Sequence, residues 1–406
     1  MTNIKKQLVD LFNSSIEQLS GKKCVHDYLS KHSFQPQYVV AIGKAAAKML
    51  EGIPFDQNLK KAILISAPAY VGDESFDPRV SIVLGSHPVP DEKSLNAGWA
   101  LLDFLSVVPA DARLLFLISG GTSAMVEVLE DGVDLSRLQQ INRWMLSQEM
   151  DISNINRIRK RLSKIKGGGL LNYFLSHDCR ALYISDVISD DPAVIGSGLL
   201  VETSETGTST GELPGWLRDF LQILPERGSA GRIEIKHEII SSAGIAKKVV
   251  ARMNSLDVPV FVHDEYLDTE VGSVSSDLIS YLELAPAGIH VWSGEPVVQL
   301  PSSPGKGGRM SALALLLAQA LDKGGMSMTI LCGASDGLDG CSVLAGGIVD
   351  ENTVQRGLRA GMHADEFINR ADSATYLQNI GAGLESRKTG TNIADLIVVF
   401  KPESAV

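Results

Sequence analysis

The chain has 406 residues, of which 44% are hydrophobic and 21% are charged. This is the composition of a globular protein, and the length is too great for one ordinary core, so we expect two domains. The formal net charge of −11 argues against nucleic acid or an anionic membrane as a partner, because binding to either needs a positive field, and an anionic small molecule would have to meet a local basic cluster.

The cysteines and the apolar runs indicate the compartment. No C-x-x-C pair occurs, and no histidine stands at zinc-finger spacing from a cysteine. Unpaired thiols are typical of a reducing cytosol, so we predict a cytoplasmic protein. The longest apolar run, residues 312–318, is much shorter than the roughly 20 residues that span a bilayer, so no membrane segment is expected.

The first candidate site follows a predicted buried strand at residues 38–42. Gly43 and Lys44 come next, before an alanine-rich helical start. A strand, a glycine and a helix in this order point backbone N–H groups at an anion, and Lys44 adds a positive charge. Neither a Walker A loop nor G-x-G-x-x-G is present. A lysine in a first helical turn is also commonly solvated, so both interpretations of Lys44 stay open.

Two further strands are predicted at residues 62–66 and 80–84. The second leads into S-H-P-V-P-D-E, where the prolines break the strand and Asp91 is expected to cap a helix. His87 in this turn is either a ligand contact or a hydrogen-bonded loop residue.

A strongly apolar strand at residues 114–118 runs into S-G-G-T-S-A-M. Gly120 and Gly121 permit a turn with convergent N–H groups, and hydroxyls follow at Thr122 and Ser123, with Ser119 before the glycines. This pattern predicts a cradle for phosphate or carboxylate. A glycine turn with a serine cap for the next helix explains the same residues almost as well.

Residues 157–166 hold six basic side chains within ten positions and lead into three glycines. This is the largest positive island of an acidic chain, and the glycines would let the backbone approach a ligand closely. Apolar residues at helical spacing also predict an amphipathic helix with solvated basic groups. Both interpretations hold if Lys166, Gly167 and Gly168 face the ligand while the more distant basic residues face solvent.

An acidic segment follows the predicted strand at residues 181–184. Asp186, Asp190 and Asp191 lie just beyond its carboxyl end, where open α/β sheets bind ligands. Gathered carboxylates repel one another unless a cation or a catalytic proton stabilises them, which favours a Mg²⁺-phosphate site. Equally, Asp190 or Asp191 could cap a helix that begins at Pro192.

A polar loop follows residue 200, and we place the domain boundary between residues 213 and 231. The second half of the chain again alternates predicted strands, glycine-rich turns and helices. Strands are expected at residues 232–240, 258–262, 288–292, 329–332 and 396–400. Arg309 ends G-K-G-G-R at a helix start and is well placed to bind carboxylate or phosphate in a bidentate manner. Asp336 and Asp339 share a glycine turn that is too short for an EF-hand.

Nine motifs occur in one order along the chain: G-K-A-A-x-K-M, S-H-P-V-P-D, L-I-S-G-G-T-S-A, N-x-x-R-K-x-L-S-x-I-K-G-G-G, S-D-V-x-x-D-D-P-x-x-I-x-S-G, S-G-E, G-G-R, S-D-G-x-D-G and T-G-T-N-x-x-D. In this order they resemble the glycerate 2-kinase family, the class II glycerate kinases that are often named hydroxypyruvate reductases. The resemblance extends from about residue 38 to residue 400 and thins between residues 201 and 285.

The resemblance implies transfer of the γ-phosphoryl group of ATP, with Mg²⁺, to the 2-hydroxyl of D-glycerate or a close 2-hydroxy acid, giving 2-phosphoglycerate. It implies an α/β fold with a larger Rossmann-like N-terminal domain, residues 1–222, and a smaller α/β C-terminal domain, residues 223–406. The active site would lie in the cleft between the domains. The assembly is left open, with a homodimer as one option.

The resemblance also implies roles for single residues. Lys44 and Arg309 would hold the substrate carboxylate and the transferring phosphoryl group, Asp186 would orient or deprotonate the hydroxyl, and the metal would be held at Asp190 and Asp191. The residues expected to bind the nucleotide are Ser119, Gly120, Gly121, Thr122, Ser123, Lys166, Gly167, Gly168 and Asp336.

The chain departs from the family pattern at three places, which puts its substrate and activity in question. After Arg309 the family pattern usually has Asn-x-Glu or similar polar residues, whereas this chain has Met310, Ser311 and Ala312. Ser189 replaces a glycine, and Leu199 replaces a proline. Two alternatives therefore stay open. One is an NAD(P)H-dependent hydroxypyruvate reductase, which the absence of G-x-G-x-x-G disfavours, and the other is a non-catalytic ligand-binding homologue.

Overall fold

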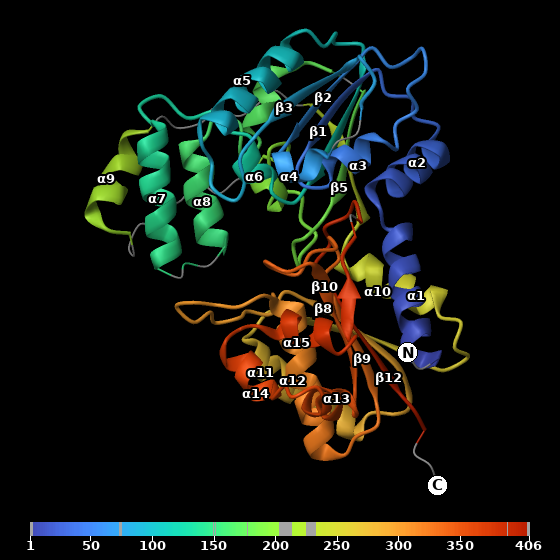
Figure 1. Ribbon diagram of the computed structural model, residues 1–406. Coiled ribbons are helices and arrows are strands. Elements are labelled where there is room, and N and C mark those ends of the chain that lie inside the picture. Colours follow the sequence, from blue (N-terminus) through green and yellow to red (C-terminus); the bar gives the residue numbers. More distant parts are fainter. Residues whose placement is uncertain are drawn as a thin grey trace. The chain divides into compact units, whose positions relative to one another are not determined.

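The computed structural model describes residues 3–72, 75–148, 150, 152–176, 178–202, 213–224, 233–387 and 389–403. The chain forms two compact units, each with its own sheet (Figure 1). The N-terminal unit is Gly21–Ile240, and the C-terminal unit combines Met1–Ser20 with Ser241–Val406. This division differs from the 1–222 and 223–406 domains expected from the sequence, because the first helix belongs to the C-terminal unit and residues 223–240 belong to the N-terminal unit.

The N-terminal unit is built on a six-stranded sheet of order β3-β2-β1-β4-β5-β6. The strands are β1 (Tyr38–Ile42), β2 (Lys61–Ser66), β3 (Val80–Leu84), β4 (Arg113–Ser119), β5 (Asp178–Ile184) and β6 (Ile235–Ser241). The pairs β1–β2, β2–β3, β1–β4 and β4–β5 are parallel. The chain runs outward from β1 to β3 and then returns to the other side of β1 at β4. The β1/β4 boundary is therefore a switch point of the topology, where parallel sheets bind ligands.

The helices of this unit vary in length. They are α2 (Gly21–His32), α3 (Ala46–Leu50), α4 (Pro68–Val71), α5 (Glu92–Ser106), α6 (Thr122–Met125), α7 (Leu135–Ser147), α8 (Ile152–Leu162), the 3₁₀ segments η1 (Gly169–Tyr173) and η2 (Ile195–Ser197), and α9 (Gly215–Ile223). Helix α5 begins at the predicted cap, because the Asp91 carboxylate accepts a hydrogen bond of 2.8 Å from the Lys93 backbone. Leu138, Ile158 and Leu217 belong to a separate core between α7, α8 and α9.

The C-terminal unit has a mixed sheet of order β11-β10-β9-β12-β8-β7. Its strands are β7 (Val260–Leu267), β8 (Gly288–Gly294), β9 (Thr329–Gly333), β10 (Leu344–Asp350), β11 (Gly383–Glu385) and β12 (Asp395–Lys401). Its helices are α1 (Asn3–Gln18), α10 (Ala243–Met253), α11 (Val271–Leu284), α12 (Arg309–Gly324), α13 (Thr353–Arg359), α14 (Ala364–Asn369) and α15 (Ser373–Asn379). In this sheet β7 and β8 pair in parallel, whereas the pairs β8–β12, β12–β9, β9–β10 and β10–β11 are antiparallel.

All ten strands expected from the sequence are present, and the expectation of an α/β protein is confirmed. Strands β10 and β11 were not among the expected strands, and β10 carries two adjacent glycines, which are uncommon inside a strand. In the sheet, a Cβ on Gly346 would lie 2.1 Å from the Cys332 carbonyl oxygen, so the glycine permits close strand pairing. Among the described helices, none combines the length and the apolar character needed to cross a membrane.

Candidate active site

Two glycine turns meet at the carboxyl ends of β1 and β4. These strands pair in parallel with Ile42 opposite Ile118, so the segments that follow them are neighbours. The Lys44 backbone N–H donates to the Gly120 carbonyl at 2.9 Å, and the Ala45 N–H donates to the Ser119 hydroxyl at 3.0 Å. The structure thus brings Lys44 and the serine-glycine turn together, as the two separate motifs had suggested.

Gly43 makes this close approach feasible. Its φ is +122°, and a Cβ at this position would lie 2.3 Å from the Ser119 hydroxyl oxygen. The Gly43 carbonyl accepts a hydrogen bond of 2.8 Å from the Ser66 hydroxyl at the end of β2. A side chain at residue 43 would separate the two turns, so the glycine is a steric requirement of the site.

The hydroxyls of the second turn are used mostly inside the protein. Ser119 and Thr122 are completely buried, and the Thr122 hydroxyl lies 2.7 Å from the Ser119 carbonyl and 3.0 Å from the Ile42 carbonyl. These contacts favour a role for both hydroxyls in shaping the turn. Gly121, with a φ of +84°, and Ser123 are the half-exposed members of the turn.

A third and a fourth segment complete this part of the N-terminal unit. Gly167 and Gly168 donate backbone hydrogen bonds to the carbonyls of Ser197 (3.0 Å) and Gly198 (2.7 Å). The Ser197 hydroxyl in turn lies 2.8 Å from the hydroxyl of Ser123. Residues 43–45, 119–123, 166–168 and 195–198 therefore form one hydrogen-bonded assembly, which we call the glycine-turn cluster.

Lys166 directly precedes the two glycines of this cluster in the chain, and its side chain is buried. Its ammonium pairs with the Glu127 carboxylate, and the two side chains are only 2% and 1% exposed. A buried lysine needs such an anion, because unpaired burial of a charge is very costly. Burial lowers the pKa of the nearby Arg159, and the charge of Glu127 opposes that shift. These contacts favour a structural role for the Lys166 ammonium.

Other residues of the basic run also have structural partners. Lys164 forms an ion pair of 2.6 Å with Asp131, and Arg161 donates to the carbonyls of Leu221 and Leu224 near the end of α9. The apolar stripe predicted for this basic segment is confirmed, since Ile158, Leu162 and Ile165 are buried. The run thus mainly holds α8 and α9 in place.

The acidic segment begins beside the glycine-turn cluster, because β5 pairs with β4 and Ile184 lies opposite Ser119. Asp186 and Asp190 are half-buried, and Asp190 adopts a φ of +51°. The Asp191 carboxylate accepts a hydrogen bond of 2.8 Å from the Ala193 N–H. The helix that one of the two open interpretations placed at Pro192 is not present: Asp191 caps a turn that leads into the short η2.

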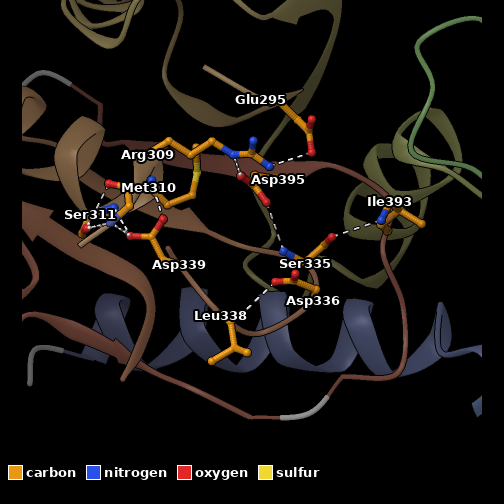
Figure 2. A network of polar contacts seen from close by, with 11 residues as sticks. Glu295, Arg309, Met310, Ser311, Ser335, Asp336, Leu338, Asp339, Ile393 and Asp395 are labelled. Atoms are coloured by element: carbon orange, nitrogen blue, oxygen red, sulfur yellow. Dashed lines mark hydrogen bonds and ion pairs between the residues drawn. The ribbon is translucent and has the colours of Figure 1, made fainter. Parts of the chain in front are cut away.

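Arg309 lies in the C-terminal unit, at the first position of α12, between two carboxylates (Figure 2). Its Nε donates to Asp395 at 2.5 Å, and its Nη2 donates to Glu295 at 2.6 Å. Burial by itself would lower the pKa of Arg309, but the charges of Asp395 and Glu295 raise it above the usual value. The side chain is 35% exposed, and its Nη1 donors have no partner among the residues that the structure describes.

Asp339 fixes the start of α12, and the sequence had not marked it as a site residue. Its buried carboxylate accepts hydrogen bonds from the backbone of Gly308 (3.1 Å), Met310 (2.9 Å) and Ser311 (2.8 Å) (Figure 2). Asp336 is half-buried and accepts from the Leu338 N–H at 3.0 Å. An aspartate that neutralises several free N–H groups of a helix start positions that helix, and with it Arg309.

The partners of Arg309 could have been found from the motifs that contain them. Glu295 ends S-G-E, and Asp395 ends T-G-T-N-I-A-D, but nothing in the spacing shows that both reach one guanidinium. The structure also shows how two residues of one departure from the family pattern, the segment after Arg309, are used. Met310 is buried in the core, and the Ser311 hydroxyl accepts a hydrogen bond of 3.1 Å from the Gly308 backbone.

Metal ligands were expected at Asp190 and Asp191. Within the described ranges, no three or more His, Cys, Asp or Glu side chains are grouped so that they could hold a metal ion. Asp191 already uses one carboxylate oxygen within its own turn. The metal role of both residues stays a prediction.

Two domain families match the chain. Residues 7–213 match a domain of unknown function, DUF4147, and residues 288–395 match the MOFRL family. The D-glycerate 2-kinase of Thermotoga maritima is 29% identical over 98% of each chain, and a putative hydroxypyruvate reductase of Agrobacterium vitis is 30% identical over 89% of this chain and 98% of its own. The crystal structure of glycerate kinase from Thermotoga maritima superposes with a TM-score of 0.85, at 25% identity, over 99% of this chain and all of that chain. The chain therefore belongs to the glycerate 2-kinase family, with an N-terminal DUF4147 domain and a C-terminal MOFRL domain.

Proposed function

We propose that this protein transfers the γ-phosphoryl group of ATP, with Mg²⁺, to the 2-hydroxyl of D-glycerate and so forms 2-phosphoglycerate. Relatives named glycerate 2-kinase support the reaction class. The observation that carries the proposal is the glycine-turn cluster, which holds Lys44 at the end of β1, beside the end of β4. The strand order 3-2-1-4-5-6 supports a Rossmann-like N-terminal domain with its ligand at this edge of the sheet.

Phosphoryl transfer depends mainly on positioning and on the neutralisation of negative charge. In the proposed site, the Lys44 ammonium and the backbone of Gly120 and Gly121 bind anionic oxygens. Ser119 and Thr122 act indirectly, because their buried hydroxyls hold the turn in shape. This assigns the ligand contacts to backbone and lysine groups more than to the serine and threonine side chains.

We assign a magnesium ion to the acidic segment after β5, where one or two carboxylates would hold it together with phosphate oxygens. Mg²⁺ takes oxygen ligands and is usually held by one or two carboxylates together with phosphate oxygens, where it neutralises the charge of the transferring group. Asp190 presents a carboxylate in this segment, and Asp191 retains one carboxylate oxygen that its turn does not use. We assign Asp186, close to the end of β5, to orient or deprotonate the substrate hydroxyl.

Arg309 is proposed to bind the substrate carboxylate or the transferring phosphoryl group through Nη1. Two carboxylates fix the plane of the guanidinium, so little side-chain entropy is lost when an anion binds. Asp336 is assigned to the nucleotide. The location of the active site in a cleft between the domains stays a prediction.

A coupled assay of ADP release tests the proposal. The purified protein is incubated with Mg²⁺-ATP and a panel of acids that contains D-glycerate, L-glycerate, D-lactate and hydroxypyruvate, and ³¹P NMR then identifies the phosphorylated position. We expect turnover with D-glycerate and a 2-phosphate product. If no acid of the panel releases ADP above the ATPase background, the proposed function is wrong.

A reductase is the second candidate, because one relative at 30% identity is named a putative hydroxypyruvate reductase. In this chain, Gly43-Lys44 follows β1 and no G-x-G-x-x-G is present, so the usual dinucleotide turn is missing. Oxidation of NADH or NADPH that depends on hydroxypyruvate would favour the reductase. Tight binding of glycerate or nucleotide without either reaction would instead indicate a ligand-binding homologue.

A further inference from the structure

His87 lies against the glycine-turn cluster, in the turn between β3 and α5. A Cβ placed on Gly121 would be 3.1 Å from His87 Cδ2 and 3.2 Å from Lys44 Cγ. The imidazole and the lysine side chain therefore meet over the same glycine. Any ligand that contacts Lys44 and the Gly121 backbone comes close to this ring.

The His87 ring is held by packing and not by hydrogen bonds. It is half-buried and stands edge-on to Tyr70, with 6.2 Å between ring centroids. Neither ring nitrogen has a hydrogen-bond partner within the described part of the chain. By contrast, Nδ1 of His237 lies 2.9 Å from the Tyr183 hydroxyl, and Nδ1 of His32 lies 2.9 Å from the Tyr28 carbonyl. The nitrogens of His87 are not among the buried polar atoms that lack a partner, so they are accessible from outside and can bond to water or to a ligand.

The surroundings of His87 also determine its charge. Burial and, to a lesser extent, the charge of Lys44 lower the pKa of His87 to about 4. The ring is then neutral at pH 7, with one N–H donor and one acceptor nitrogen. A neutral imidazole suits a hydroxyl, which can donate and accept. A second anionic group would need a protonated ring, which the adjacent Lys44 opposes.

We infer that His87 is a specificity-determining residue, whose imidazole hydrogen-bonds to a hydroxyl of the small acid that is bound beside Lys44. This inference rests on the proposed function, because it assigns the acid substrate to the Lys44 side of the site. It predicts a preference for hydroxylated monocarboxylic acids over dicarboxylic acids of similar size.

Three variants test the inference. His87→Phe keeps a ring against Tyr70 and Gly121 but removes both nitrogens, and His87→Gln keeps a donor and an acceptor. His237→Phe is the matched control, because burial also lowers the pKa of His237 but its ring already bonds to Tyr183 within the protein. We expect His87→Phe to lower kcat/KM for D-glycerate by about 10- to 100-fold, the effect of one lost hydrogen bond in a site that excludes water.

Further readouts separate a ligand contact from a structural role. In His87→Phe, KM for the nucleotide and the melting temperature should stay near the wild-type values, and His87→Gln should recover part of kcat/KM. His237→Phe should leave kcat/KM unchanged. The inference is overturned if His87→Phe matches the wild type in kcat/KM. It is also overturned if its activity falls only together with its melting temperature and glutamine restores nothing.

A binding measurement keeps the inference testable without turnover. Histidines labelled with ¹³C at Cε1 are observed by NMR, and the His87 signal is assigned as the one that His87→Phe lacks. D-Glycerate, added without nucleotide, should shift this signal, whereas propionate, which has no hydroxyl, should not. If the wild type phosphorylates no acid, the proposed function fails, and this titration still decides on His87: no shift with D-glycerate overturns the inference.

Discussion

The two units hold their proposed substrate-binding cations in different ways. In the N-terminal unit, Lys44 lies in a turn made of glycine backbone and buried hydroxyls, and within the described chain its ammonium has no ion-pair partner. In the C-terminal unit, Arg309 is fixed by Asp395 and Glu295 at 2.5 and 2.6 Å. An unpaired lysine leaves its full charge for a ligand, whereas a paired arginine offers geometry more than net charge. Lys166, buried against Glu127, shows a cation whose charge is used entirely by the fold.

The largest effect on stability is expected from Lys166. The substitution Lys166→Met should lower the free energy of unfolding by about 3–5 kcal/mol, because it leaves the Glu127 carboxylate buried without its cation. Denaturant unfolding monitored by circular dichroism measures this loss. As a control, the double variant Lys166→Met/Glu127→Leu should recover most of the stability. A single variant as stable as the wild type would contradict the structural role of Lys166 and favour its role in ligand binding.

Lys44→Ala should produce the opposite pattern. We expect kcat/KM for D-glycerate to fall by about 10²- to 10³-fold, because a charge aimed at the transferring or substrate anion is lost. The melting temperature should hardly change, since the Lys44 ammonium has no ion-pair partner in the described residues. Lys44→Arg, which keeps the charge, should retain more activity than alanine. A large loss of stability in Lys44→Ala would show that this lysine supports the fold.

Asp339→Asn tests whether Asp339 stabilises the start of α12, where Arg309 lies. The variant should lower the free energy of unfolding by about 2 kcal/mol, because a charged cap of three backbone N–H groups becomes a neutral one. Asp336→Asn is the matched control, since Asp336 accepts from one N–H and is less buried, and its loss should be smaller. Equal losses in both variants, measured by denaturant unfolding, would contradict the assigned role of Asp339.

The smallest effect concerns the influence of the Lys44 charge on the pKa of His87. The pKa of His87 is lowered to about 4, first by burial and then by Lys44, so Lys44→Gln should raise that pKa towards 6.5 without reaching it. Because the folded pKa lies below the unfolded one, His87 costs stability as pH falls from about 6.5 to about 4. The variant should therefore lose less stability over this range. Titration of the His87 Cε1 signal by NMR measures the shift, and an unchanged pKa would show that the two groups do not interact.

Much of the strand content follows from local sequence. Apolar runs such as residues 38–42 and 114–118 are strands at the expected positions, and the glycines after them form turns. Strand β10 was missed because its glycines are used for close pairing, which no local pattern reveals. The helix that one of the two open interpretations placed at Pro192 is absent for a related reason. The turn after Asp191 is tied back to the cluster through Ser197, so tertiary contacts limit it to a short 3₁₀ segment.

The sequence by itself determined the family, the α/β class, and the turns and side chains from which a phosphoryl-transfer site could be built, because short apolar runs and glycines act over a few neighbouring residues. Only the tertiary structure decided which charged groups are still available to a ligand. Lys166 meets Glu127 across 39 positions and Arg309 meets Asp395 across 86, so these pairings depend on how whole segments pack and not on local spacing. The same packing placed His87 beside Lys44 and Gly121, where a neutral ring with free nitrogens can act on a bound acid.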